Sequence, residues 1–335
     1  MAVARGSALR QGSGAIGIGS SVAKRQPLEG KLVALVGGSG FLGFHVAQAL
    51  LSRGARVRIA SRSPEKAWRL KPLAQLGQLQ FTRCDATRPS SADTAVAGAD
   101  AVVNLVATFG GDVHRSICDS AGNLAKATAR DGCEAFVHVS AIGADADSPA
   151  SYAQAKAGSE REVLAAFPFA TIIRPSALFG EDDNFVQMFA RLISVLPVLP
   201  VFGPRAELQP LSVDDAACAI ANALADPAKH GGKTYEIAGP EAITMRALNE
   251  RIAVAQNRKR GFIDVPDAAS ALFAALPGTP MNSDQWTLLK SGNRPSGSLP
   301  GLKELGVTPR PLGLFLDRWM IRYRQHGRFN EKLAG

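Results

Sequence analysis

Two residues of this sequence have the types and spacing of an acid/base pair. Tyr152 and Lys156 are four residues apart in the segment SYAQAK, and in a helix this spacing places both side chains on one face. An ammonium beside a phenol lowers the pKa of the phenol, which can then exchange a proton with a carbinol oxygen near neutral pH. The same spacing is common on surface helices, so the meaning of the pair depends on what surrounds it.

A glycine turn early in the chain supplies that context. Residues 32–46 read LVALVGGSGFLGFHV, which predicts a strand, a tight turn and the start of a helix. Gly37 lets the chain turn off the strand, Gly40 lets a pyrophosphate approach the backbone, and Gly43 lets helix and strand pack closely. The helix N-terminus then offers free N–H groups to a phosphate. The turn therefore predicts a bound dinucleotide.

The end of the next strand predicts which dinucleotide. Arg56–Ala60 is the expected strand, and Ser61 and Arg62 follow it without an acidic residue. In NAD sites an acidic residue here binds the ribose 2′-hydroxyl, whereas serine and arginine suit a 2′-phosphate. We therefore favour NADP(H) over NAD(H), the alternative being that Arg62 merely faces solvent.

The rest of the N-terminal part continues the pattern of alternating strands and helices. We expect a helix over Phe41–Arg53 and strands over Leu79–Arg83, Ala101–Leu105 and Phe136–Ser140. Such alternation predicts an α/β fold, a doubly wound parallel sheet (Rossmann) with a smaller C-terminal lobe. Ligands bind at the carboxyl edge of such a sheet.

We divide the chain into three parts on this basis. Residues 1–28 form a flexible basic N-terminal extension, 29–240 an NAD(P)-binding Rossmann domain whose segment 181–210 contributes to the second lobe, and 241–335 a C-terminal lobe with a basic amphipathic end. Met245–Ala255 is an expected helix. The Gly-, Pro-, Ser- and Asn-rich stretch 277–311 is expected to be an irregular connection.

The 335-residue chain has a net charge of +9, and nearly all of it lies at the two ends. Basic ends suit an anionic membrane surface or an acidic partner, and a solvated basic tail explains them equally well. No aromatic-interleaved basic groove accompanies the charge, so we predict no nucleic-acid binding. No apolar run is long enough for a transmembrane span. The scattered cysteines and histidines predict reduced core thiols and no metal site.

Three segments leave alternatives open. The acid-free, Arg-bearing residues 1–27 suit a mitochondrial transit peptide, a disordered bacterial leader or a misassigned start. Residues 185–202 are expected to form an amphipathic helix and a proline-broken apolar segment that packs in the lobe or faces a partner or the bilayer edge. Leu312–Tyr323, with Leu316, Trp319, Met320 and Tyr323 at helical spacing, suits a membrane interface, an acidic subunit or plain packing on the lobe.

Taken together, these motifs resemble the short-chain dehydrogenase/reductase superfamily, in its extended or atypical branch. GGSGFLG matches the glycine motif, Asp85 the adenine-contacting residue, NLVA at 104–107 the motif of the fourth strand, and YAQAK the active-site pair. IIRPSALFG at 172–180 matches a later landmark. The predicted cofactor-binding residues are Gly37, Ser39, Gly40, Phe41, Leu42, Gly43, Ser61, Arg62, Asp85, Ala86, Val106, Ala107, Tyr152, Lys156 and Pro175.

Within that superfamily the chain is most similar to the NAD(P)H-binding accessory subunits of respiratory complex I and their alphaproteobacterial relatives. FVHVSAIGAD, HGGKTYEIAGPE and the ending RYRQHGRF carry this likeness. The resemblance implies a structural NADPH and subunits of a membrane respiratory complex as partners. It places the protein in the cytoplasm, peripheral at the inner face of the bacterial inner membrane, or on the matrix side of the mitochondrial inner membrane. A cousin in ubiquinone biosynthesis implies the alternative, an active oxidoreductase or epimerase on a small or quinone-like substrate.

One departure from the superfamily bears on turnover. Active members of the extended branch carry a catalytic Ser or Thr where this chain has Ala141, beside Ser140. Alanine cannot hydrogen-bond a substrate oxygen. Tyr152 and Lys156 are thus the catalytic residues if the protein is an enzyme, and otherwise residues that hold the nicotinamide ribose.

Overall fold

The computed structural model describes residues 27–324, so residues 1–26 of the expected extension and the basic end beyond Arg324 lie outside the described part of the chain. The expected bound of the extension at residue 28 is wrong, because Leu28 is buried in the core. A seven-stranded, wholly parallel sheet forms its centre, in the order β11-β6-β5-β4-β1-β2-β3. Its strands are β1 (Leu32–Val36), β2 (Arg56–Ser61), β3 (Leu79–Arg83), β4 (Ala101–Asn104), β5 (Ala135–Val139), β6 (Thr171–Pro175) and β11 (Thr234–Ile237). This confirms the predicted doubly wound sheet.

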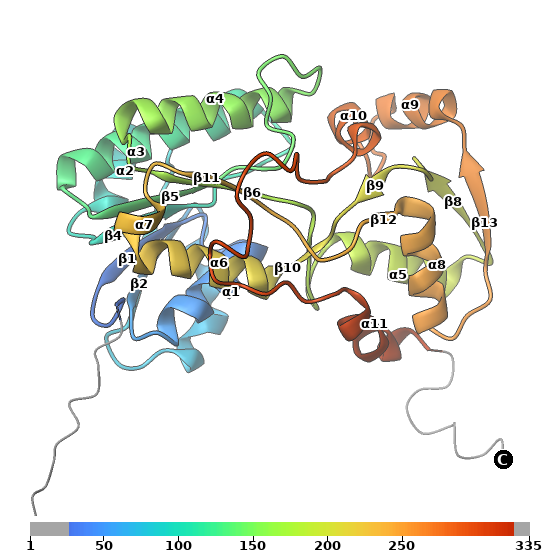
Figure 1. Cartoon of the computed structure of the whole chain (residues 1–335), viewed down its shortest axis with the longest axis horizontal. Coiled ribbons are helices and arrows are strands. Elements are labelled where there is room, and N and C mark those ends of the chain that lie inside the picture. The colour runs from blue at the N-terminus through green and yellow to red at the C-terminus, as the bar shows by residue number, and fades with distance from the viewer. Residues whose placement is uncertain (1–26, 325–335) are drawn as a thin grey trace, which may run out of the picture.

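Helices cover both faces of the sheet because its strands alternate apolar side chains between the two sides. Val33 and Leu35 of β1 share a core with the helices α1 and α6, whereas Ala34 and Val36 share the opposite core with α2, α3 and α4. Figure 1 shows these two helical layers above and below the sheet. The helices are α1 (Phe41–Leu51), η1 (Pro64–Leu73, 3₁₀), α2 (Pro89–Val96), η2 (Arg115–Asp119, π), α3 (Ser120–Asp131), α4 (Ser151–Ala166), α6 (Val213–Ala225) and α7 (Pro227–His230).

A second, smaller lobe has its own apolar core and lies beside the sheet (Figure 1). It is built around α5 and α8, with the two-stranded pair β8 and β13 on its outer side. Its elements are β7 (Leu178–Phe179), α5 (Phe185–Val195), β8 (Val198–Phe202), β9 (Glu207–Leu208), β10 (Leu211–Ser212), β12 (Ile243–Thr244), α8 (Met245–Ala255), β13 (Gly261–Val265), α9 (Asp267–Ala275), α10 (Ser283–Ser291), α11 (Gly313–Trp319) and η3 (Met320–Tyr323, 3₁₀).

The expectation of an irregular connection over residues 277–311 is wrong for its middle part. Residues 283–291 form the helix α10, and Trp286 on it is buried. The helix begins with a capping box, in which Asn282 accepts a hydrogen bond from the backbone N–H of Gln285 and the Gln285 side chain accepts one from that of Asn282. This reciprocal cap starts a helix in a stretch otherwise dominated by glycine and proline.

Both amphipathic segments of the second lobe pack into its core. Val186, Ala190 and Ile193 of α5 are buried there, and so are Leu316 and Met320 of α11 and η3. The Tyr323 hydroxyl donates a hydrogen bond to Gln187 of α5 at 2.9 Å. Of the alternatives for Leu312–Tyr323, packing on the lobe is the one that the structure shows.

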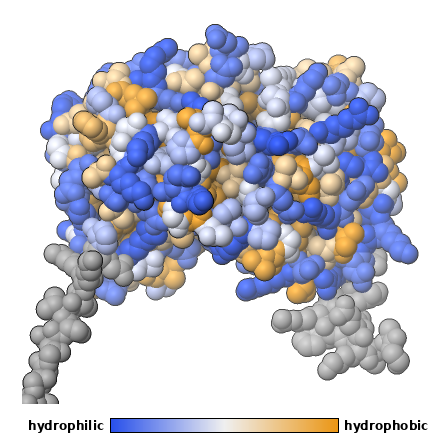
Figure 2. Space-filling model, viewed as in Figure 1, coloured by the Kyte–Doolittle hydropathy of each residue, from blue (hydrophilic) through white to orange (hydrophobic). Residues whose placement is uncertain are grey.

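The chain returns to the sheet after α10. The backbone N–H of Glu236 in β11 donates to the carbonyl of Pro300 at 2.9 Å, and Leu302 and Leu305 lie in the core shared by the sheet, α1 and α6. On the face shown in Figure 2, hydrophobic groups are scattered among hydrophilic ones. Between residues 27 and 324, no helix is long and apolar enough to cross a membrane.

Candidate functional site

The glycine turn between β1 and α1 has the geometry that a dinucleotide needs. Gly37 has a φ of +81°, which favours glycine, and a Cβ there would lie 3.1 Å from the Leu105 carbonyl carbon. A Cβ on Gly43 would lie 2.6 Å from the Gly38 Cα, so helix and turn pack too closely for any side chain. A Cβ on Gly40 would meet only the Gly37 carbonyl oxygen, and Gly40 is exposed. The helix therefore starts beside open space, and no side chain caps it.

The end of β2 holds a buried hydroxyl without a partner. Ser61 is the last residue of the strand and is 8% exposed, and its Oγ has no hydrogen-bond partner among the described residues. Arg62 follows it and is exposed. A buried hydroxyl group that is left unpaired lowers stability, and a bound oxygen acceptor would relieve that cost. The orphan hydroxyl and the exposed guanidinium thus fit a ribose phosphate.

Asp85 follows β3, the neighbouring strand. Its Oδ1 accepts hydrogen bonds from the hydroxyl of Thr87 at 2.8 Å and from the backbone N–H of Thr87 at 3.3 Å. These bonds, with the nearby Arg88 and Arg62, hold the pKa of the carboxyl below its ordinary value. The carbonyl of Ala86 accepts a hydrogen bond from Asn123 of α3 at 3.1 Å. The loop is therefore fixed, and the other Asp85 carboxylate oxygen, Oδ2, forms an ion pair with Arg88 Nε at 3.5 Å.

Lys156 is buried in the middle of the site. Its Nζ donates hydrogen bonds to the carbonyl of Val139, the last residue of β5, at 2.9 Å and to that of Val106, which follows β4, at 3.3 Å. Burial lowers the pKa of the ammonium to about 8. An ammonium has three donors, so one N–H beyond these two bonds is free for a ligand.

A chain of buried hydrogen bonds fixes the backbone around Lys156. Asn104 at the end of β4 accepts from the N–H of Val106 at 3.0 Å, and its amide nitrogen lies 3.1 Å from His138 Nδ1. His138 Nε2 lies 2.9 Å from the Oγ of Ser159, which donates to the carbonyl of Lys156 at 2.7 Å. Only a neutral imidazole with the proton on Nε2 satisfies every pairing. Burial, reinforced by the Lys156 charge, lowers the pKa of His138 well below its ordinary value, as this arrangement requires.

The environment of Tyr152 differs from the expected acid/base pair. The Tyr152 ring stacks on Phe109, with ring centroids 4.2 Å apart and 20° between the planes, while Lys156 Nζ lies 5.9 Å from the Tyr152 centroid. Burial raises the pKa of the phenol to about 12. The expectation that Lys156 lowers this pKa is therefore wrong here, because the ammonium is turned toward the carbonyls of Val106 and Val139.

Position 141, directly after β5, offers no hydroxyl to the site. Ala141 is half-buried, and the neighbouring Ser140 is buried with its Oγ unpartnered within residues 27–324. The carbonyl of Pro175 accepts a hydrogen bond from the N–H of Ile142 at 3.0 Å, which ties this loop to the end of β6. Position 141 therefore supplies no hydroxyl to complete a proton-transfer set with Tyr152 and Lys156.

The predicted cofactor residues meet at one edge of the sheet. They lie at or just beyond the carboxyl ends of β1, β2, β3, β4 and β6 or at the start of α4, and Lys156 bonds directly to Val106. Sequence reasoning missed Phe109 and Asp284, both of which contact the Tyr152 region from other parts of the chain. The capping box before Asp284 was a signal that could have placed a helix there.

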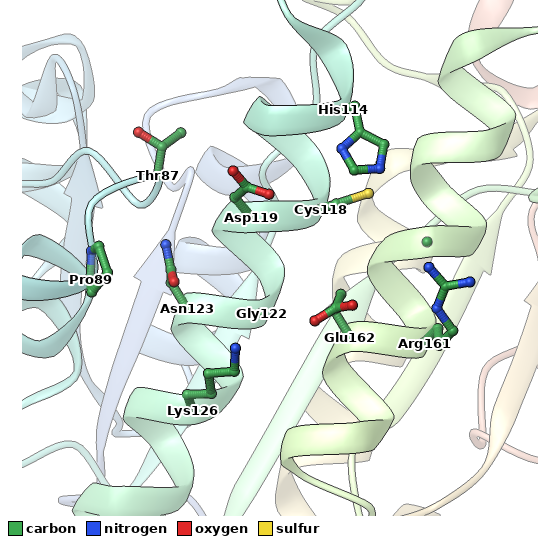
Figure 3. A pocket seen from close by; sticks show the side chains of 11 residues that line it. Thr87, Pro89, His114, Cys118, Asp119, Gly122, Asn123, Lys126, Arg161 and Glu162 are labelled. Carbon is green, nitrogen blue, oxygen red and sulfur yellow. The ribbon is translucent and has the colours of Figure 1, made fainter.

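A cleft of about 340 Å³ lies elsewhere, between α3 and α4 (Figure 3). Its wall carries Lys126 and Arg161 together with Asp119 and Glu162, so the charges are balanced. None of the predicted cofactor residues lines it. Within residues 27–324, no three His, Cys, Asp or Glu side chains gather as a metal site would need.

Comparison with known proteins agrees with this geometry. A model of an NAD(P)H-binding family matches residues 37–191, and the fold and the site define an NAD(P)H-binding protein of Rossmann type. A solved NADPH-dependent quinone oxidoreductase from Escherichia coli, complexed with NADPH, has the same fold, with a TM-score of 0.69 at 19% identity over 85% of this chain and 99% of that one.

Two curated relatives define the family more narrowly. The mitochondrial NADH dehydrogenase (ubiquinone) 1 alpha subcomplex subunit 9 of Rattus norvegicus is 32% identical over 315 residues, which cover 90% of this chain and 83% of the relative. Its counterpart in Arabidopsis thaliana is 28% identical over 90% of this chain and 80% of its own length. The chain belongs to this family, and the resemblance to complex I accessory subunits is confirmed.

Proposed function

We propose that this protein is an NADP(H)-binding, non-catalytic or weakly catalytic accessory subunit, or an assembly and stability factor, of respiratory complex I. One observation carries the proposal. The residues that would bind a nucleotide lie near one edge of the sheet, whereas the proton-transfer set would be incomplete, with Ala141 in place of a hydroxyl and a Tyr152 whose pKa burial raises to about 12. A phenol that does not ionise near neutral pH is a poor general base.

The nucleotide would be held by the residues at the sheet edge. The turn at Gly37–Gly43 with Ser39, Phe41 and Leu42 would take the pyrophosphate on the N-terminus of α1, and Asp85 with Ala86 the adenine. Val106, Ala107, Pro175 and the Tyr152 and Lys156 pair would surround the nicotinamide ribose. When bound, the nicotinamide supplies hydride chemistry. Residues 29–240 would form most of this domain, with 181–210 contributing to the lobe of 241–335, although Leu302 and Leu305 of that last segment pack in the core of the sheet.

The phosphorylated cofactor is the better fit. Ser61 Oγ is buried without a partner in the described chain, and Arg62 is exposed beside it. No carboxylate stands at the end of β2 to bind a 2′-hydroxyl, whereas a guanidinium and a hydroxyl suit a 2′-phosphate. We therefore assign NADP(H) rather than NAD(H).

The second lobe offers a surface for partners. Val195, Val198 and Ile263 are exposed on α5 and the β8–β13 pair, at 77%, 44% and 62%, and apolar groups at a surface often mark contact sites. The family relatives are named as mitochondrial complex I subunits. In a bacterium the protein would lie peripherally at the inner face of the inner membrane, and in a mitochondrion on the matrix side.

A native purification tests this function. The full chain is extracted from its own membranes with mild detergent, and both the associated chains and the bound nucleotide are identified by mass spectrometry. We expect complex I subunits and about one unreacted NADPH per chain. A protein that purifies alone and exchanges its nucleotide with every turnover of a substrate would contradict the proposal.

An alternative is an NAD(P)-dependent oxidoreductase or epimerase on a small or quinone-like substrate. The observation in its favour is that Tyr152 and Lys156 are held at the same site in the expected order along α4. Purified protein would then consume NADPH with a quinone or a sugar nucleotide, and Tyr152→Phe would abolish the activity. Activity that survives Tyr152→Phe would exclude this mechanism.

A further inference from the structure

Phe109 covers one face of the Tyr152 ring. It belongs to the loop between β4 and η2, is 43% exposed, and stacks on the Tyr152 ring at a centroid distance of 4.2 Å. Gly111 in the same loop has a φ of +71°, and the Thr108 hydroxyl accepts a hydrogen bond from the N–H of Gly110 at 3.1 Å. These features form a tight turn that presents Phe109 to the tyrosine.

Two residues of the second lobe form hydrogen bonds to the backbone of Phe109 and of Tyr152. The Asn282 side chain donates a hydrogen bond to the carbonyl of Phe109 at 3.3 Å, and its oxygen is engaged in the cap of α10. Two residues further on, the Asp284 carboxylate accepts the N–H groups of Ser151 and Tyr152, each at 3.2 Å. Because α4 has no side-chain cap of its own at Ala150, Asp284 supplies one from a distant part of the sequence.

A carbonyl substrate needs the space that Phe109 takes. Its oxygen must come within hydrogen-bond reach of the Tyr152 hydroxyl, about 2.6–3.2 Å, and Phe109 covers one face of the ring that carries this hydroxyl. A planar substrate cannot stack on the face that the Phe109 ring already occupies. A nucleotide ribose bound through the Tyr152 hydroxyl and the Lys156 ammonium would not need this face.

We propose that Phe109 is the specificity-determining residue of this site and that it excludes planar carbonyl compounds of the quinone class from the face of Tyr152. Asn282 and Asp284 act as positioning residues, because they reach Tyr152 and Phe109 only through backbone contacts. This inference rests on the proposed accessory function, and it explains why a nucleotide held beside Tyr152 would stay unreacted.

The test uses NADPH oxidation by full-length protein with 9,10-phenanthrenequinone as the probe, in which a hydride from NADPH and one proton reduce the quinone to the hydroquinone. The variants are Ala141→Ser, which restores the hydroxyl, and Phe109→Ala combined with it. We expect Ala141→Ser alone to remain near background and the double variant to be at least about tenfold faster, the scale of discrimination by one apolar contact. Adding Tyr152→Phe should abolish the gain.

A matched control removes a different phenylalanine. Phe169 is 77% exposed beyond the far end of α4, and Phe169→Ala with Ala141→Ser should stay at background. The proposal is overturned when Ala141→Ser alone equals the double variant, when the Phe169 control gains as much, or when the double variant binds NADPH normally without a faster rate. If the variant with Phe109→Ala binds no NADPH, Phe109→Leu is used in its place.

The two proposals fail in different ways in this experiment. A wild-type protein that already reduces the quinone, with loss of activity in Tyr152→Phe, overturns the accessory function. The role of Phe109 is judged only by the ratio between the double variant and Ala141→Ser.

Discussion

The imidazole of His138 lies 2.9 Å from the hydroxyl of Ser159, and both groups are fully buried. Ser159 in turn donates a hydrogen bond to the carbonyl of Lys156. On its other side the imidazole is bonded to Asn104, which accepts a hydrogen bond from the N–H of Val106. Lys156 in turn bonds to the Val106 carbonyl. A closed ring of hydrogen bonds therefore joins β4, β5 and α4, and its rigidity fixes the ammonium that would meet the ribose.

Replacing His138 tests this ring. His138→Phe leaves the Asn104 amide and the Ser159 hydroxyl buried with a partner missing, so we expect a loss of about 2–4 kcal/mol in the free energy of unfolding. Urea denaturation measures it. His114, which is exposed, is the matched control, and His114→Phe should change the free energy by less than about 0.5 kcal/mol. Similar small losses in both variants would show that the ring contributes little.

The same histidine makes stability depend on pH. The pKa of His138 lies well below 6.5 in the folded protein, so the unfolded chain binds the extra proton as the pH falls. The stability that the neutral His138 contributes is therefore fully present above about pH 6.5 and is lost as the pH falls below it. His45, whose pKa is raised by Asp214 and Asp182 against the opposing effect of its burial, acts in the opposite direction. Unfolding curves from pH 7 to 5 should fall less steeply for His138→Gln than for the wild type, and parallel slopes would contradict this.

Cofactor choice depends on Arg62 in our proposal. Arg62→Ala should weaken NADPH binding about tenfold or more, the effect of one charge-assisted hydrogen bond to a phosphate, and leave NADH binding nearly unchanged. Fluorescence titration with each nucleotide measures both affinities. Arg56→Ala, which removes an exposed arginine at the other end of the same strand, should affect neither. Equal losses for NADPH and NADH would refute the assignment.

Lys156 should make nucleotide binding depend on pH. Above its pKa of about 8 the neutral amine has two N–H groups, which the carbonyls of Val139 and Val106 occupy, so none remains for the ribose. NADPH affinity should therefore decrease as the pH rises from 7 to 9. Lys156→Met should bind weakly, and its affinity should not vary with pH over this range. A wild-type affinity constant from pH 7 to 9 would show that Lys156 does not bind the nucleotide as an ammonium.

Asp284 links the second lobe to α4. Asp284→Ala removes the cap from the N–H groups of Ser151 and Tyr152, so we expect a loss of about 1 kcal/mol in the free energy of unfolding together with weaker NADPH binding. Calorimetric melting and fluorescence titration measure the two effects. Asp267 also lies in the first turn of a helix, α9, but is exposed, and Asp267→Ala should leave NADPH binding unchanged. If Asp284→Ala binds NADPH as tightly as the wild type, the cap of α4 does not affect the nucleotide site.

Much of the fold could be predicted because its signals are local. The strands of the sheet are apolar runs between turn residues, and the expected strand Leu79–Arg83 and helix Met245–Ala255 agree with β3 and α8 at both ends. The glycine turn was equally predictable from its sequence, since Gly43 packs against Gly38 within the turn itself, although the Leu105 backbone that confines Gly37 comes from the end of β4.

The environment of Tyr152 could not be predicted in this way. Its stacking partner Phe109 and its helix cap Asp284 lie 43 and 132 residues away in the sequence, and only the folded chain brings them together. The spacing of Tyr152 and Lys156 correctly placed both residues on α4, but the direction of the ammonium depends on two carbonyls at the ends of neighbouring strands. The local pattern therefore predicts where Tyr152 and Lys156 lie, whereas their hydrogen bonds and pKa values depend on tertiary contacts.

The return of residues 300–305 to the sheet has a consequence for how the protein is made. Leu302 and Leu305 fill the core beside α1 and α6, where losing a buried leucine costs about 2–5 kcal/mol. A growing chain on the ribosome holds all seven strands by residue 237 yet lacks these two side chains. The nucleotide-binding part can therefore complete its core only after nearly the whole chain has emerged, and the second lobe must be synthesised before the first is finished.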